Sequence, residues 1–215
     1  PAYSVASVVG PASILGSFFL LPVLLRSVDL VRLRDPEQAA LRASPPAWRE
    51  PGPVSLSARN LCKVYGNGFQ ALRSLDFHLE PGIIGLLGPN GAGKTSLLRT
   101  LCGLLEPSRG QVLFRGEPVL PENRPEYRRM VGFLPQSFNA YDEISVHDFL
   151  DYWALEIGLR ETRSRRAEID RVLDQVGLVE SASKKVRNLS GGMRRRIGIA
   201  RALLGSPPIL IVDEP

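Results

Sequence analysis

The stretch of sequence that decides the fold of this chain reads Gly88-Pro89-Asn90-Gly91-Ala92-Gly93-Lys94-Thr95, followed by Ser96. It fits the pattern GxxxxGK[ST], in which glycines let the backbone curl so that successive N–H groups point inward at phosphate oxygens. Lys94 adds a mobile positive charge at the β- and γ-phosphates, and the Thr95 hydroxyl completes a magnesium ligand set. The stretch, through Ser96, therefore predicts a binding site for a nucleoside triphosphate such as ATP with Mg²⁺.

The residues on either side of this loop favour the same interpretation. Gly82–Leu87 is a short apolar run that predicts a strand, and Thr95–Leu105 carries leucines at helical spacing. A helix that starts here points the partial positive charge of its N-terminus at the same anion. An ordinary glycine turn is the alternative, but such a turn does not need a strand before it and an amphipathic helix after it.

A second acidic element lies near the end of the chain. Ile209–Val212 is an all-apolar run, typical of a strand buried on both faces, and Asp213 and Glu214 follow it. Sheets of α/β proteins place ligands at the C-terminal edge of such strands. An aspartate there can hold magnesium through its water shell, and a neighbouring glutamate can orient and polarise the attacking water. Many strands end in acidic turns, so the pair indicates catalysis only together with the phosphate loop.

From Val54 onward the chain alternates strands with helices. Besides those named above, strands are predicted at Val54–Ala58, Ala71–Leu79, Gln111–Arg115 and Met130–Leu134. A helix-rich stretch runs from Ser145 to Leu204. The order of strand, glycine loop, helix and strand predicts an α/β fold.

A further motif chooses among the many families that bind nucleotides through such a loop. Leu189-Ser190-Gly191-Gly192-Met193 lies ahead of the last apolar run. A serine and two glycines at a helix start expose backbone N–H groups and a hydroxyl to an anion. The motif and its spacing resemble the LSGG signature of the ATP-binding cassette (ABC) family. In that family the signature closes on the γ-phosphate held by a partner subunit, so the resemblance assigns Ser190, Gly191 and Gly192 to a partner's ATP.

Two more positions resemble elements of that family. Gln136, after the run Gly132–Pro135, resembles the glutamine that is a magnesium ligand and senses the membrane domain. Tyr65, in Val64-Tyr65-Gly66, resembles the aromatic residue that stacks on adenine. The resemblance also places residues 138–144 near the membrane partner. Without it, Gln136 would be an unremarkable residue after a strand and Tyr65 a turn tyrosine.

The resemblance covers residues 54–215 and implies an α/β fold with a P-loop NTPase core, an antiparallel β subdomain and a helical subdomain at about residues 145–188. It implies ATP and Mg²⁺ as cofactors. Magnesium would be held by Thr95, Gln136 and Asp213, and catalysis would fall to Glu214 and Gln136. It also implies ATP hydrolysis coupled to transport, a head-to-tail dimer with a second ABC domain, and a transmembrane permease as partner.

The sequence departs from the family pattern in two places. The signature ends in Met193 where glutamine is commonest, which leaves the serine and the glycines intact. The loop after Glu214, the distal histidine and the closing strands of the family would follow residue 215, so we expect this chain to be a piece of a longer protein. His78 and His147 lie upstream and do not replace that histidine.

The first 53 residues have a different character. Residues 5–25 contain no charged side chain and are long enough to cross hydrocarbon as a helix, and arginines follow at once. We expect residues 1–34 to be a transmembrane helix with its cytoplasmic flank, and the proline-rich residues 35–53 to be a linker. A buried helix of a soluble protein is the alternative. The expected location is the cell membrane of a bacterium, with the ATP-binding domain on the cytoplasmic face.

Charge and cysteine content narrow the range of partners. The net charge of +5 comes from scattered basic residues without a long run interleaved with aromatic residues, which argues against nucleic acid as the main partner. Cys62 and Cys102 are far apart, which argues against a disulfide framework and a zinc site. Two other functions stay open: a soluble cassette ATPase that acts on ribosomes or DNA, and an ATP-binding fragment without turnover.

Overall fold

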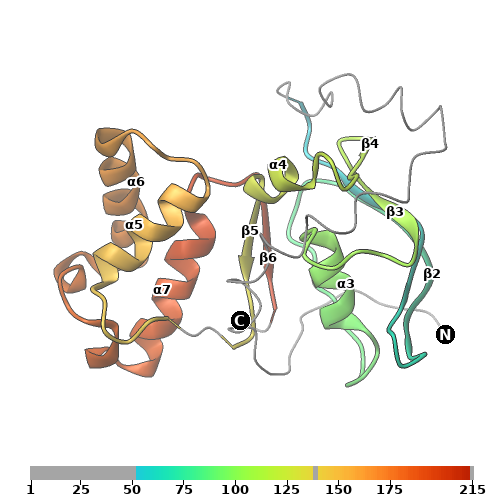
Figure 1. Ribbon diagram of the computed structural model, residues 1–215, viewed down its shortest axis with the longest axis horizontal. Helices are drawn as coiled ribbons and strands as arrows, with labels where there is room; N and C mark the ends of the chain where they lie inside the picture. The colour runs from blue at the N-terminus through green and yellow to red at the C-terminus, as the bar shows by residue number, and fades with distance from the viewer. Residues whose placement is uncertain (1–51, 138–139, 214–215) are drawn as a thin grey trace.

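The computed structural model describes residues 52–137 and 140–213. Two lobes lie on either side of a central pair of strands (Figure 1). The predicted membrane span at residues 5–25, nearly all of the predicted linker, and Glu214 lie outside the described residues. Within the described ranges, none of the helices has both the length and the apolar character that crossing a membrane requires.

One lobe is built on an antiparallel sheet of four strands, β1 (Leu56–Val64), β2 (Gln70–Leu79), β3 (Arg109–Phe114) and β4 (Glu117–Pro118), in the order β2-β1-β3-β4. The predicted antiparallel subdomain is therefore confirmed. The first strand runs past its predicted end at Ala58 to Val64, and its register with both neighbouring strands shifts between Ala58 and Cys62. Asn60 adopts a positive φ of 48° there, and such a bulge interrupts the alternation of apolar and polar residues on which the prediction depended.

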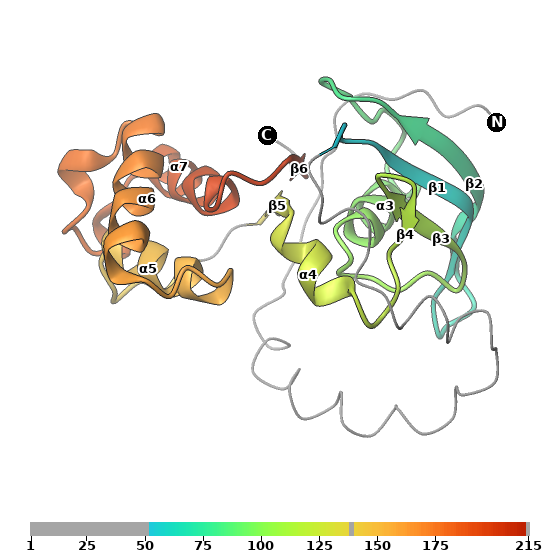
Figure 2. The ribbon, with the colours of Figure 1, turned by 90° about the horizontal axis from the view of Figure 1, so that it is seen from above.

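Helix α3 (Lys94–Leu101) packs against this sheet (Figure 2). Its buried residues Leu98 and Leu101 share one hydrophobic cluster with residues of β1, β2 and β3. The helix was predicted to continue to Leu105 but ends at Leu101, and Gly103 turns the chain with a φ of 68°.

The short helix α4 (Arg124–Arg129) satisfies the carbonyl groups at the end of α3. The buried Tyr127 hydroxyl donates a hydrogen bond of 2.6 Å to the Leu101 carbonyl oxygen. The Arg128 guanidinium donates to the Gly103 carbonyl oxygen through Nε at 2.8 Å and through a terminal nitrogen at 2.5 Å. Helix α4 therefore fixes the C-terminal end of the helix that follows the phosphate loop.

Between the lobes, β5 (Val131–Leu134) and β6 (Ile209–Val212) form a parallel pair with Leu134 opposite Val212. Both strands were predicted, and both are present. The prediction that β6 is buried on both faces is wrong, because Leu210 is 46% exposed. The strand predicted at Gly82–Leu87 is wrong: these residues belong to neither sheet, and Ile83, Ile84 and Leu87 are exposed. An apolar run becomes a strand only where a neighbouring strand pairs with its backbone. Within the described ranges β6 is paired with β5 alone, and residues 82–87 do not pair with its other edge.

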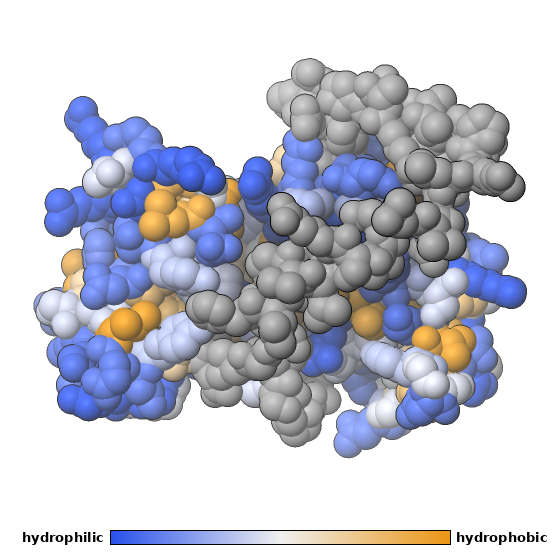
Figure 3. Space-filling model, viewed as in Figure 1, coloured by the Kyte–Doolittle hydropathy of each residue, from blue (hydrophilic) through white to orange (hydrophobic). Residues whose placement is uncertain are grey.

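The second lobe consists of helices α5 (Val146–Glu156), α6 (Thr162–Gln175) and α7 (Gly191–Leu203), with short 3₁₀ helices η2 (Val179–Ser181) and η3 (Val186–Asn188). It has a hydrophobic cluster of its own, separate from that of the sheet lobe. All three α-helices lie within the stretch predicted to be rich in helix. Charged and polar side chains cover most of the face of this lobe in Figure 3.

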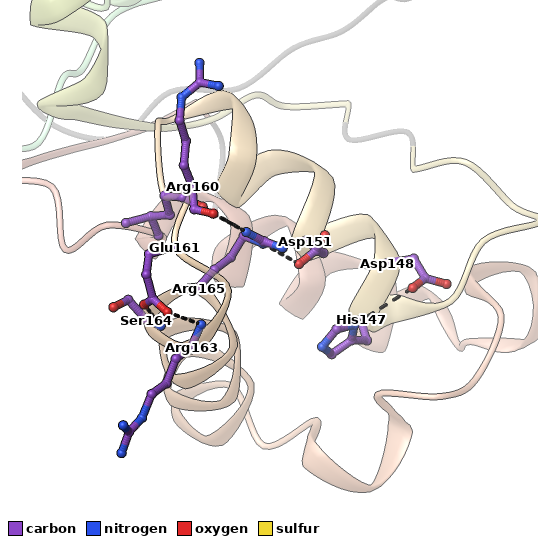
Figure 4. Close-up of polar contacts among 9 residues, drawn as sticks. His147, Asp148, Asp151, Arg160, Glu161, Arg163, Ser164 and Arg165 are labelled. Atoms are coloured by element: carbon purple, nitrogen blue, oxygen red, sulfur yellow. Dashed lines mark hydrogen bonds and ion pairs between the residues drawn. The ribbon is translucent and has the colours of Figure 1, made fainter.

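Polar contacts close the start of α6 and join it to α5 (Figure 4). The Glu161 carboxylate caps α6 by accepting the backbone N–H groups of Arg163 and Ser164. Arg165 points back to α5, where its Nε lies 2.6 Å from Asp151 Oδ1. Arg165, one of three arginines among residues 163–166, therefore has an internal structural role.

The close approach of β5 to the end of α7 gives a stability prediction. A Cβ atom at Gly132 would overlap the Ala202 carbonyl oxygen and come within 2.9 Å of Pro207 Cγ. We expect Gly132→Ala to lower the free energy of unfolding by roughly 1–3 kcal/mol, since backbone must move to admit the methyl group. Chemical denaturation measures this change. Gly66→Ala is the control, because a Cβ there meets nothing within 4 Å, and an equal loss in both variants would contradict the steric account.

Candidate functional site

The phosphate loop lies directly against β2. Gly91 and Gly93 have φ values of 81° and 88°, a region that favours glycine. A Cβ atom at Gly93 would overlap the Ala71 carbonyl oxygen of β2. Glycine is therefore required at position 93 both by backbone conformation and by the contact with the sheet, and this contact sets where α3 begins.

The Lys94 ammonium group lies within the loop that precedes it. Its Nζ donates hydrogen bonds to the carbonyl oxygens of Gly88 at 2.5 Å and Pro89 at 2.8 Å. A positive charge held at this position by weakly basic carbonyl groups can exchange them for phosphate oxygens, which bind an ammonium group more strongly. The loop residues Gly88–Lys94 therefore gather the features that the sequence predicted.

The hairpin between β1 and β2 brings Tyr65 to the start of α3. The Tyr65 hydroxyl and the Ser96 hydroxyl are 2.9 Å apart, so both predicted nucleotide contacts are in one place. Two neighbours of Tyr65 were missed in the sequence. The Phe69 ring is stacked beside it with centroids 6.4 Å apart, and Lys63 Nζ lies 5.6 Å from its centroid. An aromatic residue at each end of a glycine-rich hairpin tip was the signal that could have indicated Phe69.

Asp213 is buried beside the start of α3. Only 2% of the residue is exposed, and its backbone N–H donates to the Leu134 carbonyl oxygen at 2.9 Å. Burial raises the pKa of its carboxyl group above the usual 3.8, while Arg99, a hydrogen bond from Thr95 and the charge of Lys94 act in the opposite direction. The structure therefore brings Thr95 and Asp213 together, and it adds Arg99, which the sequence did not indicate.

The residues around Asp213 fit a magnesium ion. The buried Oδ1 atom of Asp213 has no hydrogen-bond partner, which is costly unless a ligand or its water completes the site. Magnesium prefers oxygen ligands and usually takes one or two protein groups together with waters and substrate phosphates. Thr95 and Asp213 supply such oxygens beside the phosphate loop.

Gln136 lies at the same edge of the parallel strands as Asp213. Leu134, the last residue of β5, is paired with Val212, the last residue of β6. Gln136 comes two residues after Leu134, and Asp213 comes directly after Val212. The half-buried Gln136 is therefore placed by strand register at the edge where α/β sheets bind ligands.

The signature residues belong to the other lobe. Ser190 caps α7, because its Oγ atom accepts the Met193 backbone N–H at 3.3 Å. Gly191 and Gly192 are exposed, and a Cβ atom on either would meet nothing within 4 Å. Figures 1 and 2 show α7 and α3 on opposite sides of β5 and β6. The structure thus gathers Tyr65, the loop and Asp213, and leaves the signature facing outward.

Comparisons with known proteins agree with this geometry. A family model described as ABC transporter matches residues 72–215, well over half of the chain. The chain is 42% identical over 161 residues to the Nod factor export ATP-binding protein I of Cupriavidus metallidurans. It is 41% identical over 161 residues to the uncharacterized ABC transporter ATP-binding protein YxlF of Bacillus subtilis. Each alignment covers 74% of this chain and 52% of the relative, so the chain spans about half the length of these curated relatives.

Solved structures share the fold. The structure of cbiO1 from Clostridium perfringens, part of the ABC transporter complex cbiONQ, matches with a TM-score of 0.62 and 27% identity, over 75% of this chain and 65% of that one. The dimeric structure of MJ0796, a bacterial ABC transporter cassette, matches with a TM-score of 0.63 and 26% identity, over 73% of this chain and 72% of that one. The P-loop fold that the sequence predicted is therefore confirmed.

The raised pKa of Asp213 gives a prediction on stability and pH. Between the usual value of 3.8 and the higher folded value, the native state binds more protons than the unfolded state, so the contribution of Asp213 to stability falls as pH rises. We expect Asp213→Asn, which removes the charge, to raise the melting temperature at pH 7. Melting curves of the two proteins should converge as the pH approaches 3.8.

The exposed Asp170 provides a matched control for this measurement, since Asp170→Asn removes the same charge from the surface of α6. Its melting temperature should stay close to that of the parent at every pH. An Asp213→Asn variant that melts below the parent at pH 7 would show that ionised Asp213 stabilises the fold.

Proposed function

This chain belongs to the ABC transporter family, and we propose that it binds Mg-ATP and hydrolyses it to drive transport across a bacterial cell membrane. The ATP-binding domain faces the cytoplasm in this proposal, and a permease carries the substrate. The observation that carries the proposal is the buried Asp213 carboxylate beside Thr95 and Lys94, with one oxygen free of hydrogen bonds. Such an arrangement is unfavourable for stability alone, and it suits a site completed by a charged ligand.

Each part of the site has a separate role. The amides of Gly88–Gly93 and the Lys94 ammonium hold the β- and γ-phosphates, and Tyr65 stacks on the adenine ring while its hydroxyl contacts Ser96. The helix dipole of α3 adds positive potential at the same point. This division explains why the loop and the hairpin tip are in contact: the two ends of one nucleotide must be held at a fixed separation.

Magnesium, when bound, neutralises charge on the phosphates and orients them for attack. Thr95, Gln136 and Asp213 would hold it, directly or through water. Glu214 directly follows Asp213, and we assign it the task of orienting the attacking water and accepting its proton. Gln136 would sense the permease as well as the metal, because the chain leaves β5 through this residue.

A second cassette completes the site. Ser190, Gly191 and Gly192 present a capped helix N-terminus to the surface, in the lobe that does not hold the phosphate loop. We propose that these residues close on the γ-phosphate bound by a partner domain in a head-to-tail dimer. The dimeric assembly named for the MJ0796 structure is compatible with this proposal.

The transported substrate is left open by the relatives. The relatives are named for Nod factor export, for linearmycin resistance, and for sulfate and thiosulfate import. Export and import both occur among proteins of similar identity to this chain, so we propose transport without a direction. Selection of the substrate falls to the permease, since the site described here recognises only the nucleotide.

The role of Lys94 can be tested on the full-length protein. We expect Lys94→Ala to weaken ATP binding by about 10- to 100-fold, because a charge-assisted contact to phosphate is lost. Isothermal titration measures the affinity. Lys184→Ala, which removes an exposed lysine of the helical lobe, should bind as the parent does. Equal affinity of the parent and the Lys94→Ala variant would refute the proposed phosphate site.

The role of Glu214 separates binding from hydrolysis. We expect Glu214→Gln in the full-length protein to retain ATP binding and to lower phosphate release by about 100-fold or more, because the amide cannot accept the proton of the attacking water. Equilibrium titration with ATP measures the binding step, and the steady-state rate of phosphate release measures hydrolysis, so the two measurements on the variant separate the steps. Unchanged turnover would show that another group activates the water.

A further inference from the structure

We propose that Arg194 is a positioning residue for ATP hydrolysis. Its ion pair with Asp142 holds residues 142–144 against the first turn of α7, and so fixes where Ser190–Gly192 lie. The inference rests on the proposed function, since a movement of this segment matters only if the signature acts on a nucleotide. The sequence analysis placed Asp142 only within residues 138–144, near the membrane partner, and it gave Arg194 no role.

Arg194 contacts the segments on both sides of the signature. Its terminal nitrogen lies 3.1 Å from Asp142 Oδ1, and the other terminal nitrogen donates to the Arg187 carbonyl oxygen at 3.1 Å. Its backbone N–H donates to the Ser190 carbonyl oxygen at 2.9 Å. The Arg194 side chain therefore connects Arg187, ahead of the capping serine, with Asp142, while its backbone N–H makes the helical hydrogen bond to Ser190.

Backbone hydrogen bonds join the same two segments. The Arg187 N–H donates to the Asp142 carbonyl oxygen at 3.1 Å, and the Val186 N–H donates to the Ile144 carbonyl oxygen at 3.0 Å. Ser145 and Lys185, the next residues along the two segments, form an isolated antiparallel bridge. Residues 142–146 and 184–188 thus form a paired unit, which we call the strap.

Buried side chains attach the strap to the helical lobe. Val146 and Val186 are fully buried, and Leu189 is nearly so, all in the hydrophobic cluster of α5, α6 and α7. A displacement of residues 142–144 therefore displaces residues 186–189 as well, because the packed cluster does not deform continuously. Leu189 is the first residue of the signature, so Ser190–Gly192 move with it.

Charges on the strap are paired and exposed. Glu143 lies 2.7 Å from Arg187 and 3.1 Å from Lys185, and hydrogen bonding to Lys185 together with the charge of Arg187 lowers the pKa of its carboxyl group. The side chains of Arg194 and Asp142 are 40% and 57% exposed. Exposed ion pairs contribute little to stability, so loss of the Arg194–Asp142 pair should alter geometry at the signature and leave the fold intact.

The experiment reverses each charge and then both, in the full-length protein with its permease. We expect Arg194→Glu and Asp142→Arg each to lower kcat for ATP by about three- to tenfold, with KM for ATP within about twofold of the parent. The double variant should recover most of the lost kcat, because the ion pair is restored with opposite polarity. The recovery should shrink at high ionic strength, which screens exposed pairs.

A second readout tests the positioning without nucleotide. Amide hydrogen exchange of residues 191–195 should be faster in both single variants than in the parent and should slow again in the double variant. Asp170→Arg, a charge reversal on the exposed face of α6, should change neither kcat nor this exchange. Equal melting temperatures across the series would exclude global destabilisation as the cause.

The outcomes separate the two proposals. A double variant that exchanges and turns over no better than the single variants would overturn the role of the Arg194–Asp142 pair, while ATP turnover by the parent would still support the proposed function. A parent without ATP turnover would refute the proposed function. In that case, slow amide exchange of residues 191–195 restored in the double variant would still support the positioning role of the Arg194–Asp142 pair. Exchange that stays fast in the double variant would refute that role.

Discussion

Asp213 holds its carboxylate at the end of β6, almost wholly buried and next to the Thr95 hydroxyl, and the rest of the structure is arranged around this contact. Burial of a charge without a full set of partners opposes folding. Lys94 and Arg99 offset part of that cost through their positive charge. Three supports keep these groups together: the pairing of β5 with β6, the packing of Gly93 on β2, and the capping of α3 by Tyr127 and Arg128.

Local chemistry explains what the sequence could predict. The glycines of the phosphate loop, the serine cap of α7 and the apolar run of β6 each depend on rules that act within a few residues, and the structure has all three. The Gly82–Leu87 strand failed because pairing depends on a neighbour distant in sequence. The Tyr65–Ser96 contact, the Arg99 charge near Asp213 and the strap were missed for the same reason, since each joins elements that only the fold brings together.

The two lobes have separate hydrophobic clusters, and this separation suits the proposed dimer. A domain that binds ATP with one lobe and contacts a partner's ATP with the other can open and close by changing the angle between its lobes. Two packed cores joined by short connections can rotate as bodies while each keeps its own contacts. A single continuous core would oppose such a rotation, because every buried contact across the hinge would have to be remade.

The helical lobe and the proposed metal site are mechanically linked. The connection from α7 to β6 is tied down where it starts: Arg171 donates to the Leu203 carbonyl oxygen at 3.1 Å, and the Gly205 N–H donates to Glu168 at 2.7 Å. Gly132 lies against Ala202 of α7 and Pro207 of the connection, so β5 contacts both. Any rotation of the helical lobe is therefore transmitted to β6 and to Asp213 at its end. On the other side of the helical lobe, the strap is held by backbone hydrogen bonds and buried side chains, and its exposed ion pairs cost little to break and remake. In the proposed cycle a rotation of the helical lobe would therefore move the signature and the end of β6 together, so that closure on a partner's nucleotide and the geometry of the metal site are mechanically coupled.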